Sequence, residues 1–173
     1  MQMKWIQLLI LFFAGCSPLL GYSEEKEDAA DISMRSLKYY VHHQLHDDYT
    51  QTSTFQFVTK ILDERAVQDA KVRRLSYSTS IEDLKILEAY TEKANGERIA
   101  VPENNYQQNV NSGRDKSRPV FSDRTSLSVV YPDVEVGDSI AIKYVITTSE
   151  AMFPGHFTDL RHFAPSVAYD DVE

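Results

Sequence analysis

Apolar and polar side chains alternate along two neighbouring segments in the C-terminal third of the chain. The apolar face of the first segment is Leu127, Val129 and Tyr131, and after Pro132 the second repeats the pattern at Ile140, Ile142, Tyr144 and Ile146. A period of two is typical of strands with one buried face. We therefore predict an antiparallel hairpin in a sheet, with Gly137 and Asp138 supplying the positive-φ geometry of its turn.

Strand patterns also occur in the N-terminal two thirds of the chain, separated by turn residues. The segments are 37–45, 49–61, 72–77 and 84–91, with Asp47 and Asp48 as the first turn. Residues 63–70 have the one helical pattern, and the polar residues 104–119 predict a long loop. About seven or eight strands with little helix predict an all-β fold, an antiparallel β-sandwich.

The N-terminus has the pattern of an export signal. Lys4 precedes an apolar run of about ten residues, Trp5 to Ala14, which is too short to span a bilayer. Two processing routes remain open. Phe13-Ala-Gly-Cys16 is similar to a bacterial lipobox that would attach lipid to Cys16, and Gly21-Tyr-Ser23 fits a conventional cleavage site.

Both routes divide the chain in the same way and carry it out of the cytoplasm. We expect residues 1–23 to be a signal peptide, residues 24–36 an acidic tether, and residues 37–173 the β-sandwich domain. The product would be periplasmic, an outer-membrane lipoprotein, or secreted. Membrane contact would come only through a lipid on Cys16.

The charge of the chain argues against two classes of partner. The chain has 26 acidic and 18 basic residues, a net charge of −8. Nucleic-acid binding needs a basic surface that neutralises phosphates, and anionic lipid attracts basic segments. We therefore expect neither of these partners.

Candidate catalytic and metal-binding residues are few. Cys16 is the only cysteine and lies in the predicted signal peptide, so the domain would have no disulfide and no thiol nucleophile. His42 and His46 would lie about 13 Å apart on a strand, too far for one metal ion with bonds of about 2 Å. We expect these two to be exposed, His43 to lie near the core, and His156 and His162 to be surface residues. No metal or cofactor is predicted.

We interpret two pairs of oppositely charged residues as charge pairs at strand ends. They are Asp123 with Arg124 and Asp159 with Arg161. General acid–base catalysis requires groups that converge in a pocket, which sequence proximity does not establish. The sequence has no nucleophile elbow and no phosphate-binding glycine loop. Paired carboxylates of the glycosidase type stay open, because their separation depends on the fold. We predict that the chain is not an enzyme.

An apolar cluster after the last strand pattern is the better candidate for function. Its residues are Met152, Phe153, Pro154, Phe157 and Phe163. One interpretation is a corner that folds back over one end of the sandwich core. The other is an interaction surface, because aromatic residues and Met are enriched where proteins meet. Both interpretations could hold for different faces of the cluster.

Several short motifs, taken in order, identify a family. They are Ile86 to Thr91 with the turn Asn95-Gly96 and Arg98 to Pro102, then Phe121-Ser-Asp123, Pro132 with Val134 to Asp138, and Phe153-Pro-Gly155 with Phe157. From about Tyr39 to Pro165 the chain resembles the secreted bacterial domain of unknown function that precedes transglutaminase-like cores. Asn95 stands where Asp is commoner, and Glu150 where an uncharged residue is expected.

The resemblance implies a non-catalytic accessory module of the cell envelope that positions or recruits a protein substrate or partner. It implies a Cys-His-Asp core in a following domain, so the partner would be that transglutaminase-like domain in cis or another protein in trans. It also implies β-structure beyond the segment matching 166–173, so we expect an incompletely closed C-terminal edge. The alternative is a free-standing peptide- or glycan-binding envelope protein with an open groove lined by Tyr39, Tyr77 or Tyr131.

Overall fold

The computed structural model describes residues 31–110, 123–151, 153 and 155–173. The predicted signal peptide, the lipid site at Cys16 and most of the predicted tether lie outside these residues, as do Met152 and Pro154. Within the described part of the chain, no helix has the length and apolar character needed to cross a membrane.

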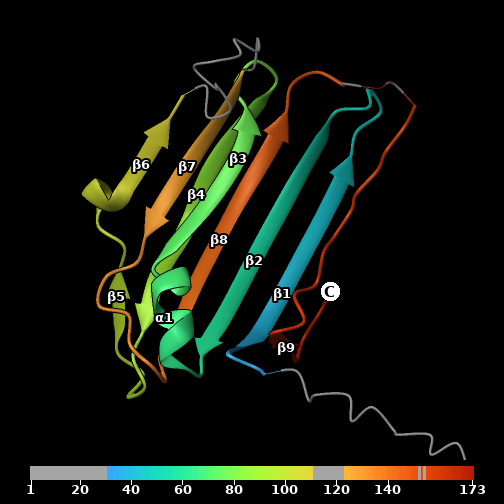
Figure 1. Cartoon of the computed structure of the whole chain (residues 1–173). Coiled ribbons are helices and arrows are strands. Elements are labelled where there is room, and N and C mark those ends of the chain that lie inside the picture. Colours follow the sequence, from blue (N-terminus) through green and yellow to red (C-terminus); the bar gives the residue numbers. More distant parts are fainter. Residues whose placement is uncertain (1–30, 111–122, 152, 154) are drawn as a thin grey trace, which may run out of the picture.

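Two β-sheets form the domain (Figure 1). The larger has the order β5-β4-β8-β2-β1-β9 and the smaller the order β3-β7-β6. The larger sheet consists of β1 (Met34–Leu45), β2 (Gln51–Ile61), β4 (Glu82–Glu92), β5 (Arg98–Ala100), β8 (Ser139–Thr148) and β9 (Val167–Tyr169). The smaller consists of β3 (Val72–Ser78), β6 (Tyr106–Asn109) and β7 (Arg124–Val130). The predicted all-β sandwich with little helix is confirmed.

The core lies between the sheets and follows the predicted alternation. Strands β2 and β8 are antiparallel neighbours at the centre of the larger sheet, with Phe55 opposite Tyr144 and Phe57 opposite Ile142. These four side chains are buried, and the rings of Phe55 and Tyr144 stack at 4.6 Å. On the facing sheet, Val129 of β7 is fully buried. Sheet-on-sheet burial of this kind is the main favourable contribution to folding.

The predicted hairpin between the two most regular strand patterns is wrong. Both segments are strands, but β7 pairs with β3 and β6, whereas β8 pairs with β2 and β4. The chain therefore crosses from one sheet to the other between Val130 and Ser139. The period of two locates a strand and its buried face, but it does not select a partner, and two strands facing one core show the same alternation. Gly137 does have a positive φ, at 93°.

The short helix α1 (Glu64–Ala70) confirms the helical pattern at 63–70. Asp63 is its N-cap, and the Asp63 carboxylate accepts a hydrogen bond from the backbone N–H of Arg65 at 2.8 Å. This contact satisfies one of the donors that a helix leaves free at its N-terminus. The helix buries Ala66, Val67 and Ala70 against the core.

Two predicted segments need correction. Strand β1 begins at Met34, so the predicted tether does not continue to residue 36. The predicted loop at 104–119 overlaps the 3-10 turn η1 (Glu103–Asn105) and contains strand β6, and its residues 111–119 lie outside the described residues. Strand β6 is an edge strand of polar residues, YQQN, which explains why no strand pattern marks it. The short strand β9 was also missed, because three residues carry too little pattern.

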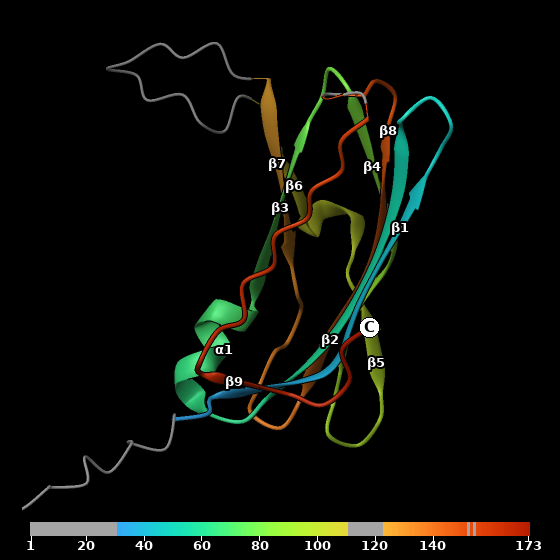
Figure 2. The ribbon, with the colours of Figure 1, turned by 90° about the vertical axis from the view of Figure 1, so that its right-hand side faces the viewer.

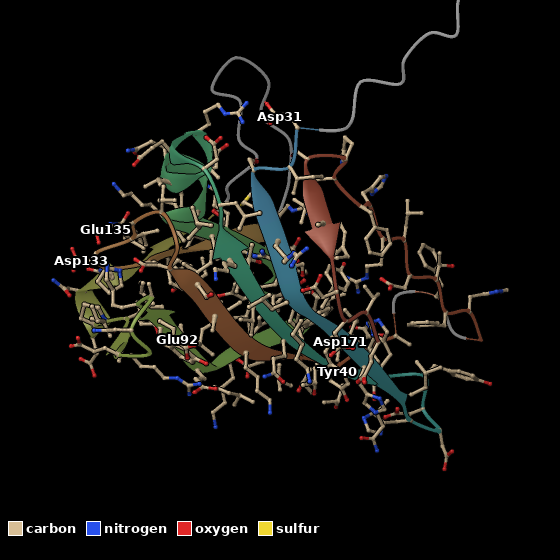
Figure 3. All side chains as sticks on the ribbon, turned by 90° about the horizontal axis from the view of Figure 1, so that it is seen from below. Asp31, Tyr40, Glu92, Asp133, Glu135 and Asp171 are labelled. Carbon is tan, nitrogen blue, oxygen red and sulfur yellow. The ribbon has the colours of Figure 1, made fainter. Side chains whose placement is uncertain are left out.

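The last residues of the chain cover the outer edge of β1. Strand β9 pairs with β1 in parallel, from Met34 opposite Val167 to Ser36 opposite Tyr169. Beyond β9, the N–H of Tyr39 donates to Asp171 and that of Val41 to Glu173, at 2.8 and 2.9 Å. Figure 3 shows Asp171 beside the neighbouring Tyr40 at this edge. The outer edge of β1 is therefore covered from Met34 to Val41.

Candidate interaction surface

The described residues between β8 and β9 form no helix or strand and run along one side of the sandwich (Figure 2). We call residues 151, 153 and 155–166 the strap. Its large apolar side chains are strongly exposed: Phe153 67%, Phe157 46%, Leu160 75% and Phe163 53%. The predicted interaction residues Phe153, Phe157 and Phe163 thus lie on one surface segment. Leu160 was missed, because a single Leu between polar residues gives no pattern.

The strap is fixed to the domain by part of each aromatic surface. The centroid of the Phe163 ring lies 5.5 Å from that of Tyr39 and 5.0 Å from that of Tyr169. The centroids of the Phe157 and His43 rings lie 5.1 Å apart. These tilted and edge-on contacts are the arrangements that aromatic pairs prefer. Phe157 and Phe163 therefore cover inner side chains of β1 and β9 and still present surface to solvent.

His43 is the polar anchor of the strap. Its Nδ1 lies 2.8 Å from the hydroxyl of Ser53, and its Nε2 lies 3.4 Å from Oδ2 of Asp159. Arg161 donates from Nε to the same Asp159 oxygen at 2.6 Å, so the predicted charge pair forms, although it lies within the strap and not at a strand end. Burial alone would raise the pKa of Asp159, but the hydrogen bond and charge of Arg161, with His43, hold that pKa below its usual value.

This arrangement contains the residue types of a serine hydrolase but not the access that catalysis needs. Ser53 is 2% exposed and pairs across the sheet with His43, so its hydroxyl does not face a site that a substrate can enter. The His43 to Asp159 distance is also long for a hydrogen bond. The trio is best explained as the attachment of the strap to β1 and β2.

The other histidines lie where the sequence predicted. His42 and His46 are exposed and His43 is half-buried, and His156 and His162 are exposed on the strap. Among the described residues, no group of three or more His, Cys, Asp or Glu side chains is arranged to hold a metal ion.

The tyrosines proposed as alternatives for lining a binding groove lie in different surroundings. Tyr131 is 3% exposed, and the Tyr77 hydroxyl accepts a hydrogen bond from Gln108. Tyr39 lies against the rings of Phe57 and Phe163 and lines a small pocket of about 190 Å³ with Phe57 and Tyr169.

A groove that the sequence analysis missed lies on the other side of the sandwich. It has a volume of about 680 Å³ and lies where β4, β5, β6 and β7 approach one another, lined among others by Leu87, Tyr90, Arg98, Tyr106 and Leu127. A β-bulge in β4 between Ile86 and Glu88 turns Leu87 outward, to 48% exposure. The inward face accordingly changes phase, from Leu84 and Ile86 to Ala89 and Thr91. This phase change was readable in the sequence.

The Gly-Asp motif at the crossover is structural. The Asp138 side chain is 2% exposed and accepts hydrogen bonds from Nζ of Lys93 at 2.8 Å and from the N–H groups of Ala94 and Glu135. The Asp138 hydrogen bond is the main cause of the raised pKa of Lys93, and Glu135 adds to it. Asp133 and Glu135, seen together in Figure 3, lie on the same loop and remain exposed at 72% and 71%.

Asp123 also has a structural role. Its carboxylate accepts hydrogen bonds from the hydroxyls of Ser78 and Ser80, which lower the pKa of Asp123. These contacts join the start of β7 to the end of β3. The carboxylate therefore acts as a tie between neighbouring strands.

Solved structures resemble this fold to different degrees. The chain is similar to a protein of Parabacteroides distasonis titled a "putative protease", with a TM-score of 0.63 and 19% identity over 70% of this chain and 24% of that one. At this identity the likeness shows the fold alone. The chain thus corresponds to about a quarter of that protein's length.

A second likeness is weaker. A family 3a carbohydrate-binding module from the cipA scaffolding of Clostridium thermocellum gives a TM-score of 0.32 at 14% identity, covering 64% of this chain and 74% of that one. So low a score supports no conclusion about fold or ligand. No curated protein matches the chain.

A family model matches most of the domain. It covers residues 47–172 and is described as "Domain of Unknown Function with solved-structure structure (DUF3857)". This match agrees with the resemblance to a domain of unknown function. It begins in the turn between β1 and β2 and ends at Val172, which bridges to β1. The described fold and this match together show that the chain belongs to the DUF3857 family.

Proposed function

We propose that the chain is a non-catalytic accessory module of the cell envelope, and that its strap binds a partner protein. The preferred partner is a transglutaminase-like domain, either in the same polypeptide or in another chain. The observation that carries this proposal is the strap itself, which presents Phe153, Phe157, Leu160 and Phe163 at 46–75% exposure on one segment. Clustered apolar surface of this kind is typical of protein contact sites.

The strap is suited to binding because its shape is set before a partner arrives. Phe157 and Phe163 are held by ring contacts, and the Asp159 and Arg161 pair holds the backbone between them against His43. Side chains that are already ordered lose less conformational entropy on association. A partner would therefore gain apolar contact at low entropic cost.

The comparison with the Parabacteroides distasonis protein supports the idea of a module. The similar region is 24% of a chain described as a putative protease, which leaves most of that chain for other domains. A unit of this kind beside a peptidase-like core would position or recruit a protein substrate. The structural attachment of Ser53, His43 and Asp159 supports a role without catalysis of its own.

Site-specific photo-crosslinking in the source bacterium tests the proposal. A benzoylphenylalanine replaces Leu160 on the strap, and Glu97, exposed on the β4–β5 turn, is the matched control position. We expect Leu160 to crosslink to a protein region that contains a Cys-His-Asp transglutaminase-like core, and Glu97 not to do so. Crosslinks from both positions alike, or from Leu160 only to proteins without such a core, would contradict the proposal.

We also propose that residues 1–23 direct export, with either a lipid on Cys16 or cleavage near Glu24. Lys4, the short apolar run and the small residues before both sites support this route. Cell fractionation and labelling with a radioactive fatty acid test it. Label that is lost in Cys16→Ser supports the lipid route, label that persists in this variant rules it out, and a chain that stays in the cytoplasm contradicts export.

A further inference from the structure

The side of the sandwich opposite the strap combines a free strand edge with a groove. Strand β5 is the outer neighbour of β4 and pairs with it only over Tyr90–Glu92, next to a hydrogen bond from Val101 to Ala89. For Glu82–Glu88, the described residues provide no strand on that side. In Figure 1 this side of the molecule, marked by β5 and β6, faces away from β9. A row of backbone groups without a strand neighbour can pair with another chain.

The groove begins where this free edge ends. Ala89, Val101 and Leu127 form its apolar floor, and Leu87 and Tyr106 stand at its sides. Its volume of about 680 Å³ lies within the range of ligand sites and can hold a large apolar side chain. A strand that pairs with Glu82–Glu88 would bring every second side chain toward the gap between the sheets.

Charge around the groove favours one kind of peptide. Strand β4 carries Glu82, Asp83, Glu88 and Glu92 against the single base Lys85. The nearby Arg98 is already bound to Glu92 at 2.7 Å. Glu88 lines the groove and makes none of the ion pairs found among the described residues, although Lys143 lies opposite it on β8 and its charge also acts on Arg98. The four acidic side chains of β4 still outnumber the basic Lys85, Arg98 and Lys143, so a cationic side chain is favoured beside this strand.

Arg98 also argues against a sugar ligand. Its guanidinium lies over the ring of Tyr90 at 4.5 Å, so this face of the aromatic ring is occupied.

We propose that the Glu82–Glu88 edge of β4 binds an extended peptide by strand addition, with an apolar side chain of the peptide in the groove and a Lys or Arg beside Glu88. This site is separate from the strap and does not depend on the partner proposed for it.

Fluorescence anisotropy with a defined probe tests the site. The probe is a fluorescein-labelled ten-residue peptide that alternates Val and Lys, mixed with the purified chain. We expect the probe to bind saturably. Its affinity should be about tenfold lower when alternate backbone nitrogens of the peptide are methylated. Its affinity should also fall when the Lys residues of the peptide are replaced by Glu. Equal binding of the methylated peptide, or no binding to a folded chain, overturns the proposal.

Variants locate the binding. Ala100 is exposed and lines the groove, so Ala100→Arg should abolish binding, and Glu88→Gln should weaken it about two- to fivefold. Ala164→Arg on the strap is the matched control and should leave peptide affinity unchanged. Hydrogen exchange should show new protection of amides in Glu82–Glu88 on peptide binding, a readout that does not depend on any variant folding well.

Other occupants give different results. A second copy of the chain would appear as concentration-dependent association in sedimentation that Ala100→Arg removes without added peptide. A glycan would appear as binding of chitohexaose at the groove in the absence of peptide binding. Either result overturns the proposal of a peptide site. If Ala164→Arg loses peptide binding and Ala100→Arg keeps it, the peptide binds to the strap, and this result also overturns the proposal.

Discussion

The Nζ atom of Lys93 lies 2.8 Å from Oδ2 of Asp138, and this ion pair joins the turn between β4 and β5 to the segment on which the chain crosses between the sheets. Asp138 is 2% exposed and also accepts backbone N–H hydrogen bonds from Ala94 in that turn and from Glu135 in the crossover segment. The pair therefore fixes the crossover that distinguishes this fold from a simple hairpin.

Replacing Asp138 should destabilise the domain more than replacing Glu135, the exposed acid that also binds Lys93. Asp138→Asn removes the buried charge opposite Lys93 and weakens the accepted hydrogen bonds, so we expect a loss of about 1–3 kcal/mol in the free energy of unfolding. Glu135→Gln, at a side chain that is 71% exposed and also binds Lys93, should cost no more than about 0.5 kcal/mol. Urea unfolding of both variants gives the comparison, and equal losses would show that the buried contacts are unimportant.

Gly137 should be sensitive to a side chain for conformational reasons. Its φ is 93°, and an added Cβ would lie 3.8 Å from Ala94 Cβ, so the space is adequate and the backbone conformation is the limit. We expect Gly137→Ala to lower the free energy of unfolding by about 1–2 kcal/mol, and Gly137→Asn, which tolerates positive φ better, to lower it less. Thermal melts that rank the two variants in the opposite order would contradict this explanation.

The first turn of α1 should respond to acid. Hydrogen bonds from the Arg65 side chain and backbone lower the pKa of Asp63 from 3.8 to about 2. Because the folded pKa is lower than the unfolded one, this carboxylate stabilises the folded state above about pH 4, and the contribution is lost as the pH falls toward 2.

An NMR titration of the Asp63 carboxyl carbon measures this directly and should give a midpoint near 2. Asp63→Ser keeps an N-cap oxygen but not the ionisable group, so the acid response of the first turn should become smaller and come from Asp31, whose pKa Arg65 also lowers. A midpoint close to 4 in the unmodified chain would mean that Arg65 does not hold the carboxylate in solution.

The arrangement of Ser53, His43 and Asp159 should give no catalysis. We expect the purified chain to show no peptidase, transglutaminase or glycosidase activity, and Ser53→Ala to leave the background hydrolysis of p-nitrophenyl acetate unchanged. Ser53→Ala should instead lower the free energy of unfolding by about 1 kcal/mol, because it removes the hydrogen bond to His43. Turnover that disappears in Ser53→Ala but persists in the stability control Gly137→Ala would identify an enzyme.

The local part of the fold could be predicted from the sequence. Side-chain patterns predicted the strand β2 and both the strands and the buried faces of β7 and β8, and Asp63 marked the start of α1. The partners of β7 and β8 could not be predicted, because two strands that face one core from different sheets have the same period. Strands β6 and β9 were missed because edge strands that bury little apolar surface carry little hydrophobic pattern.

The candidate sites divide in the same way. The aromatic residues of the strap stood out because Phe153, Phe157 and Phe163 are close in sequence. The groove depends on residues from four strands and on the bulge at Leu87, so proximity in the fold, and not proximity in the chain, creates it. His43 and Asp159 are likewise far apart in sequence and meet only because the strap passes over β1.

The parallel pairing of β1 with the end of the chain has a mechanical consequence. Backbone hydrogen bonds link Ser33 to Ser166, Ser36 to Asp170 and Tyr39 to both Asp171 and Glu173. Because the two strands run in the same direction, a force that pulls Ser33 and Glu173 apart acts along the strands and loads these bonds together, in shear. Breaking them one at a time would require a force across the strands. The domain should therefore resist tension between its two ends better than a hairpin of the same length pulled open from its ends.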